Sequence, residues 1–144
     1  MFRLIFIVLF SYIIQCSSVS GQTQAQKNNI SQKVEALFKV AQTNDYLGIK
    51  NLILIEEKEN EKTKFRIPDI ENSSDVSKIK RYCNTLKGLK KVSDQFLIEE
   101  FKTEEYNGYN ITVAILSFKS GDQTIYKYIR FAPLEKEYYL IKID

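Results

Sequence analysis

The sequence of 144 residues contains no histidine and no tryptophan, and only two cysteines, two prolines and five glycines. Without histidine, the chain cannot form a Ser-His-Asp triad, a Cys-His pair or an ordinary zinc site. The glycines stand at positions 21, 48, 88, 108 and 121, too dispersed for a phosphate-binding loop, and no carboxylate spacing matches a calcium loop. We therefore expect no metal or nucleotide cofactor.

The overall composition is that of one globular domain. Apolar residues make up 44% of the chain and charged residues 27%, which excludes a disordered tail. The 21 basic residues nearly balance the 18 acidic residues, and a net charge of +3 gives no electrostatic argument for a nucleic-acid partner. We therefore expect no nucleic acid among the partners.

The N-terminus has the pattern of a secretory signal peptide, at residues 1–21. Arg3 supplies a positive charge, residues 4–14 form an apolar run, and small or polar residues follow. The run is about half of the ~20 residues that a transmembrane helix needs, so no permanent membrane span is expected. Cleavage between Gly21 and Gln22 predicts an exported protein, periplasmic or secreted.

Cys16 offers an alternative maturation. The stretch Ile13-Ile14-Gln15-Cys16 partly resembles the lipobox of bacterial lipoproteins, in which a lipidated cysteine becomes the new N-terminus. Gln15 departs from that pattern, because a small residue usually precedes the cysteine. Two outcomes stay open, a free exported domain and a membrane-anchored envelope lipoprotein attached through Cys16.

The mature chain is expected to place its helices before its strands. Residues 22–30 are polar and predict a disordered spacer. Apolar residues at helical spacing predict helices over about 31–43 and 45–54, and a third helix that begins after Ser74 or Asp75 and ends near residues 88–92. Between the second and third helices, the charged stretch 56–64 predicts an exposed loop, and 65–67 is at most a short edge strand.

After Ser93 the apolar residues alternate instead of following a helical period. Four runs rich in aromatic and β-branched residues predict strands at about 95–103, 109–119, 123–132 and 138–143. Short turn-type links join them, which predicts an antiparallel meander. The second run is apolar on both faces and is expected to be a covered central strand. The predicted fold class is α+β, with three N-terminal helices packed on a curved, cone-like antiparallel sheet of four to five strands in one domain, 31–144.

This order of elements resembles the nuclear transport factor 2-like (cystatin-like) superfamily, a cone-shaped α+β fold that includes ketosteroid isomerase and scytalone dehydratase. The resemblance covers residues 31–144. It rests on the topology, on the segment ALFKVAQTNDYLGIKNLI at 36–53, which is similar to the first helix pair, and on the closing strand at 138–144. Small exported members without a known activity are common in this superfamily, so the resemblance implies a fold and a concave pocket rather than a reaction. Its enzymes built on a His-Asp pair cannot be matched, because histidine is absent.

The implied pocket would lie between the helices and the concave face of the sheet. By analogy of fold, we expect Phe38, Tyr46, Tyr82, Ile115 and Ile129 to line it. A packed core is the alternative explanation of the same residues.

The third predicted helix carries a run of basic residues with no acid between them: Lys78, Lys80, Arg81, Lys87, Lys90 and Lys91. At about 100° per residue, Lys80, Lys87 and Lys91 share one face and predict a basic patch for anionic lipid, polysaccharide or a partner. A solvated face neutralised by nearby acids is the alternative.

The sequence thus predicts an exported, non-catalytic binding or interaction module. The alternative is a small pocket enzyme of the isomerase or dehydratase type that uses a carboxylate and a tyrosine. Such an enzyme needs a carboxylate with a raised pKa in a closed apolar cavity, and no catalytic residue is assigned. The partners left open are a small molecule, an envelope protein and a second copy of the chain.

Overall fold

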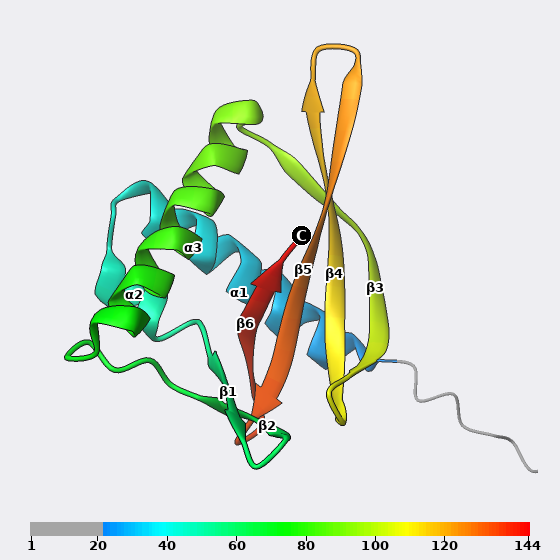
Figure 1. Ribbon diagram of the computed structural model, residues 1–144. Coiled ribbons are helices and arrows are strands. Elements are labelled where there is room, and N and C mark those ends of the chain that lie inside the picture. The colour runs from blue at the N-terminus through cyan, green and yellow to red at the C-terminus, as the bar shows by residue number, and fades with distance from the viewer. Residues whose placement is uncertain (1–21) are drawn as a thin grey trace, which may run out of the picture.

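The computed structural model describes residues 22–144, and the predicted signal peptide and Cys16 lie outside the described residues (Figure 1). None of the described helices is long and apolar enough to cross a membrane. The elements follow one another along the chain as helices α1 (Gln24–Gln42) and α2 (Tyr46–Lys50), strands β1 (Ile55–Glu59) and β2 (Lys62–Arg66), helix α3 (Ser73–Val92), and strands β3 (Phe96–Tyr106), β4 (Tyr109–Ser120), β5 (Gln123–Leu134) and β6 (Glu137–Ile143).

The last four strands form one antiparallel sheet in the order β3-β4-β5-β6, which confirms the predicted meander. The turn between β3 and β4 consists of Asn107 and Gly108, both with positive φ (50° and 84°), as a tight hairpin turn requires. A bulge between Ile98 and Glu100 bends β3. Strands β1 and β2 form a separate two-stranded sheet rather than a fifth strand of the meander.

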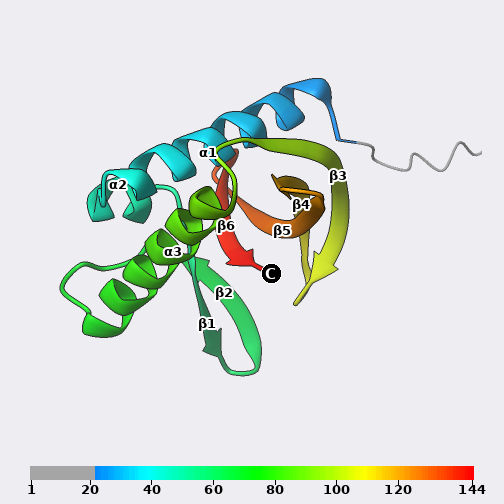
Figure 2. The ribbon, with the colours of Figure 1, turned by 90° about the horizontal axis from the view of Figure 1, so that it is seen from above.

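The main core lies between the helices and one face of the sheet. In the view from above, α1 runs along one side of the molecule and the β1–β2 hairpin extends from the other (Figure 2). Buried side chains of α1 and α3, such as Leu37 and Leu86, pack with Phe118 and Phe131 of the sheet. This arrangement confirms the α+β class.

A second, smaller core lies on the opposite face of the sheet. Ile111 and Val113 of β4 and Ile141 of β6 are buried there, and Phe65 of β2 packs against them. The hairpin therefore covers one end of this face, so β4 is apolar on both faces in that region, as its sequence predicted.

The prediction of a disordered spacer over 22–30 is wrong, because α1 begins at Gln24. Thr23 and Gln26 form a reciprocal capping box, in which each side chain accepts a hydrogen bond from the other residue's backbone N–H. Ile30 is fully buried and anchors this turn to the core. One buried apolar residue and an N-terminal cap thus suffice to extend the helix. The polar composition of residues 22–30 gave no sign of this.

The prediction of a loop over 56–64 is also wrong, because these residues form most of the β1–β2 hairpin. Opposite charges face each other in the register, at Glu57–Lys64 and Glu59–Lys62, and such cross-strand pairs stabilise a strand that carries few apolar residues. The two-residue turn at 60–61 takes positive φ at both positions without glycine (49° and 64°).

Helix α2 ends at Lys50, four residues before its predicted end. The backbone N–H of Leu54 donates to the carbonyl of Leu140 at 2.8 Å, and the N–H of Leu140 donates to the carbonyl of Leu52 at 2.9 Å. These residues are therefore bonded to β6 instead of continuing the helix.

Two helical glycines should respond in opposite ways to alanine. A Cβ on Gly48 would lie 2.5 Å from Asp45 Oδ2 and 2.8 Å from Val40 Cγ1, so Gly48→Ala is expected to destabilise the protein by about 1–2 kcal/mol. A Cβ on Gly88 meets nothing within 4 Å, so Gly88→Ala is expected to stabilise by about 0.5–1 kcal/mol through helix propensity. Urea unfolding of both variants checks this, and a gain in stability for Gly48→Ala would contradict the packing at α2.

Candidate functional site

The five residues expected to line a pocket do not come together. Phe38 and Ile129 are buried in the main core, and Ile115 lies on the opposite face of the sheet because successive residues of a strand point to opposite sides. Tyr46 is 40% exposed on α2. Tyr82 lines a surface hollow instead. The space between the helices and this part of the sheet is filled by side chains, as in an ordinary core.

That hollow, called here the basic hollow, lies where α3, β1 and β6 meet and has a volume of about 390 Å³. Its lining comprises four cations, one carboxylate, two phenol groups and three aliphatic side chains, namely Lys58, Lys78, Arg81, Lys142, Glu56, Tyr82, Tyr106, Leu54, Ile55 and Ile141. Its size is within the range of small-molecule sites.

Three of its cations have no carboxylate partner within the described part of the chain. Lys78 and Arg81 lie one helical turn apart on α3, and Lys58 belongs to β1. Among residues 22–144, none of the three has a carboxylate within 4.0 Å. The fourth cation, Lys142, is paired with Asp144 at 3.0 Å. Lys58, Lys78 and Arg81 therefore have no close ion pair, although the charge of Lys78 contributes to lowering the pKa of Asp75, and Glu56 lines the same hollow.

Tyr82 fixes the wall between α3 and β6. Its hydroxyl donates to the carbonyl oxygen of Ile141 at 2.6 Å, and the guanidinium carbon of Arg81 lies 5.9 Å from the ring centroid. Burial raises the pKa of Tyr82, so the phenol stays neutral at physiological pH. The aromatic ring thus supports Arg81 by a cation–π contact.

Glu56 supplies the acceptor side of the hollow. Tyr106 donates its hydroxyl to Glu56 Oε2 at 2.9 Å, Asn107 donates from Nδ2 to Oε1 at 2.9 Å, and the hydroxyl of Thr63 lies 3.5 Å from Oε1. Burial, and then the bond to this carboxylate, raise the pKa of Tyr106. These bonds hold the carboxylate in place and join β1 to the β3–β4 turn.

The predicted basic patch lies on the other flank of α3. At about 100° per residue, Lys80, Lys87 and Lys91 lie about 140–180° around the helix axis from Lys78 and about 80–120° from Arg81. Lys87 and Lys91 line a second hollow of about 420 Å³ at the end of α3, whereas Lys80 is an exposed residue outside its lining.

The lysines at the end of α3 have structural partners. Lys87 Nζ donates to Asn44 Oδ1 at 2.7 Å, and Lys90 Nζ donates to the carbonyl oxygen of Asp94. Cations in the last turn also offset the negative end of the helix dipole. Of the three residues of the predicted patch, Lys87 therefore already has a hydrogen-bond partner within the fold.

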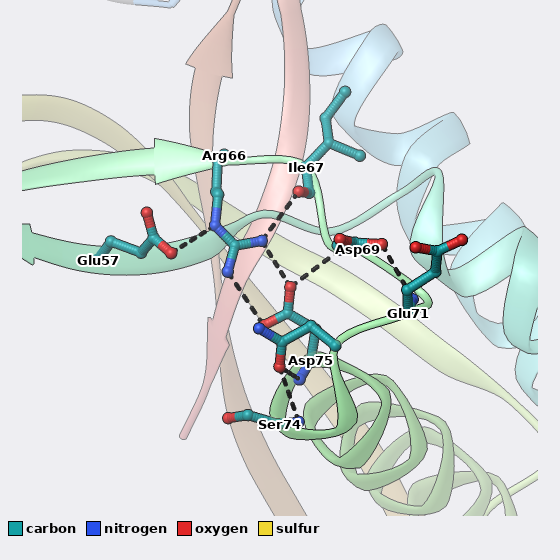
Figure 3. A network of polar contacts seen from close by, with 8 residues as sticks. Glu57, Arg66, Ile67, Asp69, Glu71, Ser74 and Asp75 are labelled. Carbon is teal, nitrogen blue, oxygen red and sulfur yellow. Dashed lines mark hydrogen bonds and ion pairs between the residues drawn. The ribbon is translucent and has the colours of Figure 1, made fainter.

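A partly buried ion pair fixes the hairpin that forms one wall of the basic hollow (Figure 3). Arg66 of β2 donates from both terminal nitrogens to the carboxylate of Asp75, with Nη2 at 3.2 Å from Oδ1, and from Nε to Glu57. The backbone N–H of Asp69 also donates to Asp75, at 2.9 Å. We call these four residues the clamp, because they tie the hairpin to the first turn of α3.

The carboxyl groups with shifted pKa values behave as ion-pair partners. The hydrogen bonds from Arg66 lower the pKa of Asp75, although its burial acts in the opposite direction. Lys33 lowers the pKa of Glu137 in the same way. These shifts are opposite to the rise that a general acid requires, so neither group suits the enzyme alternative.

Cys83 packs within the core, where its thiol lies 3.5 Å from the carbonyl oxygen of Ala41. Burial raises the pKa of this thiol, which disfavours the reactive thiolate. Within residues 22–144, no group of three or more Cys, Asp and Glu side chains is arranged to hold a metal ion.

Sequence reasoning missed the basic hollow because it joins distant segments. Lys78 and Arg81 belong to the basic run noted in the sequence. Lys58, however, lies in the stretch expected to be a loop, and Lys142 lies near the end of the last strand. The spacing of Lys78, Arg81 and Tyr82 was the one local signal, since residues three and four apart share a helix face.

Comparisons with known proteins add a likeness of shape. No protein-family model matches the sequence, and no curated protein matches it either. Among solved structures, the chain is similar to a designed nuclear transport factor 2-like protein, with a TM-score of 0.42 and 11% identity. The match covers 82% of this chain and 97% of the other. At that score and identity it assigns neither family nor function.

Proposed function

We propose that the protein is a non-catalytic binding module that takes an anionic ligand in the basic hollow. The observation that carries the proposal is the convergence of Lys58, Lys78 and Arg81 on one hollow without carboxylate partners among the described residues. Clustered like charges repel one another, so an arrangement of this kind gains stability when an anion enters it.

The walls of the hollow favour a defined site over a general charged surface. Tyr82 is held by its bond to Ile141, and Glu56 is held by Tyr106 and Asn107. Such fixed walls reduce the entropy lost on binding. The guanidinium of Arg81 adds a planar fork that pairs well with carboxylate or phosphate oxygens.

Removal of either of the two α3 cations that line the basic hollow is expected to weaken anion binding. Lys78→Ala and Arg81→Ala should each raise the Kd for inorganic phosphate by about tenfold, because each removes one charge-assisted hydrogen bond. Isothermal titration calorimetry at constant ionic strength measures the effect, and constant salt matters because screening changes with it.

Lys80→Ala is the matched control, since it removes the same charge from the same helix on the opposite flank. It should leave the Kd within about twofold of the original value, because an exposed charge outside the hollow contributes little. Equal losses for Lys80→Ala and Lys78→Ala would show that only net charge matters and would overturn the assignment of the site.

We also propose that the protein is a small exported member of the nuclear transport factor 2-like superfamily. The order of helices, short strands and meander supports the family, and the signal pattern at residues 1–21 supports export. The mass of the mature protein distinguishes a start at Gln22 from a lipidated start at Cys16.

A further inference from the structure

We infer that the ligand of the basic hollow is a phosphate monoester carried on a hydroxyl-bearing group, such as a sugar phosphate or a phosphorylated lipid headgroup. This inference rests on the proposed function and narrows it from any anion to one chemical class. It is argued from the charge count, the acceptors and the size of the hollow.

The charge count favours a dianion. Lys142 shares the carboxylate of Asp144 with Arg130, and the other three cations of the lining face one lining carboxylate, Glu56, which leaves two positive charges in excess. A phosphate monoester carries about −1.5 to −2 at pH 7, whereas a carboxylate or a phosphate diester carries one negative charge. A monoanion would therefore leave one cation of the hollow uncompensated.

The acceptors favour hydroxyl groups on the rest of the ligand. Glu56 receives hydrogen bonds from Tyr106 and Asn107, yet a carboxylate has about four acceptor positions. The remaining capacity of Glu56 suits a donor, and the phosphate group of a monoester dianion has no proton to donate. A hydroxyl on the carrier satisfies this side of the hollow.

The volume of the hollow, about 390 Å³, supports a carrier larger than the phosphate itself. Sites of this size hold organic molecules, and an isolated phosphate ion would fill a small part of it. Leu54, Ile55 and Ile141 are almost fully buried, so the half-buried rings of Tyr82 and Tyr106 offer the carbon surface against which a carbon skeleton can pack.

Calorimetry with the purified protein tests the ligand class. Glucose 6-phosphate and glycerol 3-phosphate are the monoester probes. Glucuronate tests one negative charge on a similar ring, inorganic phosphate tests the dianion without a carrier, and glucose tests the carrier alone. At least one monoester should bind tenfold or more tightly than glucuronate and inorganic phosphate, and glucose should give no measurable heat.

A Glu56→Gln variant tests the acceptor side separately. Removal of this negative charge should tighten binding of inorganic phosphate and reduce the preference for the monoester over it by severalfold. Thermal unfolding of the variant confirms that it is folded. An unchanged preference would overturn the assigned role of Glu56 in contacting the carrier.

Failure of the inference and failure of the proposed function give different results. If glucuronate or inorganic phosphate binds as tightly as both monoesters, and Lys78→Ala weakens all of them, the ligand class is wrong while the anion site stands. If no probe binds, or if Lys78→Ala and Lys80→Ala behave alike, the proposed function itself is wrong.

Vesicle binding distinguishes the two sources of a phosphate monoester, a lipid headgroup and a soluble small molecule. Phosphatidylcholine vesicles with phosphatidylinositol 4-phosphate present a monoester on a hydroxyl-bearing ring, and vesicles with an equal fraction of phosphatidylinositol present the same ring with a diester alone. Tighter binding to phosphatidylinositol 4-phosphate that Arg81→Ala weakens about tenfold assigns a lipid headgroup, whereas binding of the soluble monoesters alone assigns a free small molecule. Equal binding to both vesicles, unaffected by Arg81→Ala, would overturn the lipid source.

Discussion

Phe118→Ala should lower the free energy of unfolding by about 3–5 kcal/mol, which is the range for truncating a buried phenylalanine. Phe118 is fully buried, and its ring centroid lies 6.0 Å from that of Phe38 and 5.9 Å from that of Phe96. The truncation opens a cavity where α1, β3 and β4 meet. Urea unfolding followed by circular dichroism measures the loss.

Two control variants separate this cavity from a general effect on the sheet. Phe118→Leu keeps most of the volume and should cost about 1.5 kcal/mol or less. Tyr128→Ala truncates an aromatic residue on the opposite face, which is 41% exposed, and should cost less than Phe118→Ala. If Tyr128→Ala costs as much as Phe118→Ala, the assignment of the two faces of β5 is wrong, since a slip of one residue exchanges the faces of a strand.

The meander could be predicted because its sequence and its tertiary structure agree. β4 is the clearest case, since a run of β-branched and aromatic residues between Asn107-Gly108 and Ser120-Gly121 leaves few alternatives to a strand. Its predicted range, 109–119, differs from the structure by one residue.

The β1–β2 hairpin could not be predicted in the same way, because tertiary contacts determine it. Glu57, Glu59, Lys62 and Lys64 read locally as a solvated loop, and their pairing becomes visible only once the register is known. Phe65 then packs against residues more than forty positions away, such as Tyr109 at 4.9 Å between ring centroids. Local sequence carries no information about such contacts.

The candidate site, too, could be predicted only where it depends on local sequence. The helix face with Lys78, Arg81 and Tyr82 follows from spacing alone, but the hollow exists because Lys58 and Lys142 arrive from β1 and β6. The pocket expected from the family resemblance failed for a related reason. An analogy of topology does not tell whether the concave face is open, and here Phe38 and Ile129 fill it.

Asp75→Asn should lower the free energy of unfolding by about 2–3 kcal/mol at pH 7, because the buried carboxylate accepts charge-assisted hydrogen bonds from Arg66. The bonds from Arg66 lower the pKa of Asp75 in the folded protein. The stability from this pair is therefore fully present above the unfolded pKa of about 4 and is lost as the pH falls through the lower, folded pKa. The difference between the two proteins should shrink below about pH 4 in urea unfolding curves.

Glu57→Gln is the control, because it removes a half-exposed partner of the same guanidinium and should cost about 1 kcal/mol or less at pH 7. The clamp holds the hairpin that carries Glu56 and Lys58. Asp75→Asn should therefore speed amide hydrogen exchange in β1 and β2 more than in β4. It should also weaken phosphate binding in the basic hollow. A cost of Asp75→Asn that is the same at pH 3 and pH 7 would show that the charge of Asp75 does not hold the clamp. A loss of stability without any loss of binding would show that the hairpin wall is dispensable, so the two measurements together decide whether the clamp supports the fold alone or the basic hollow as well.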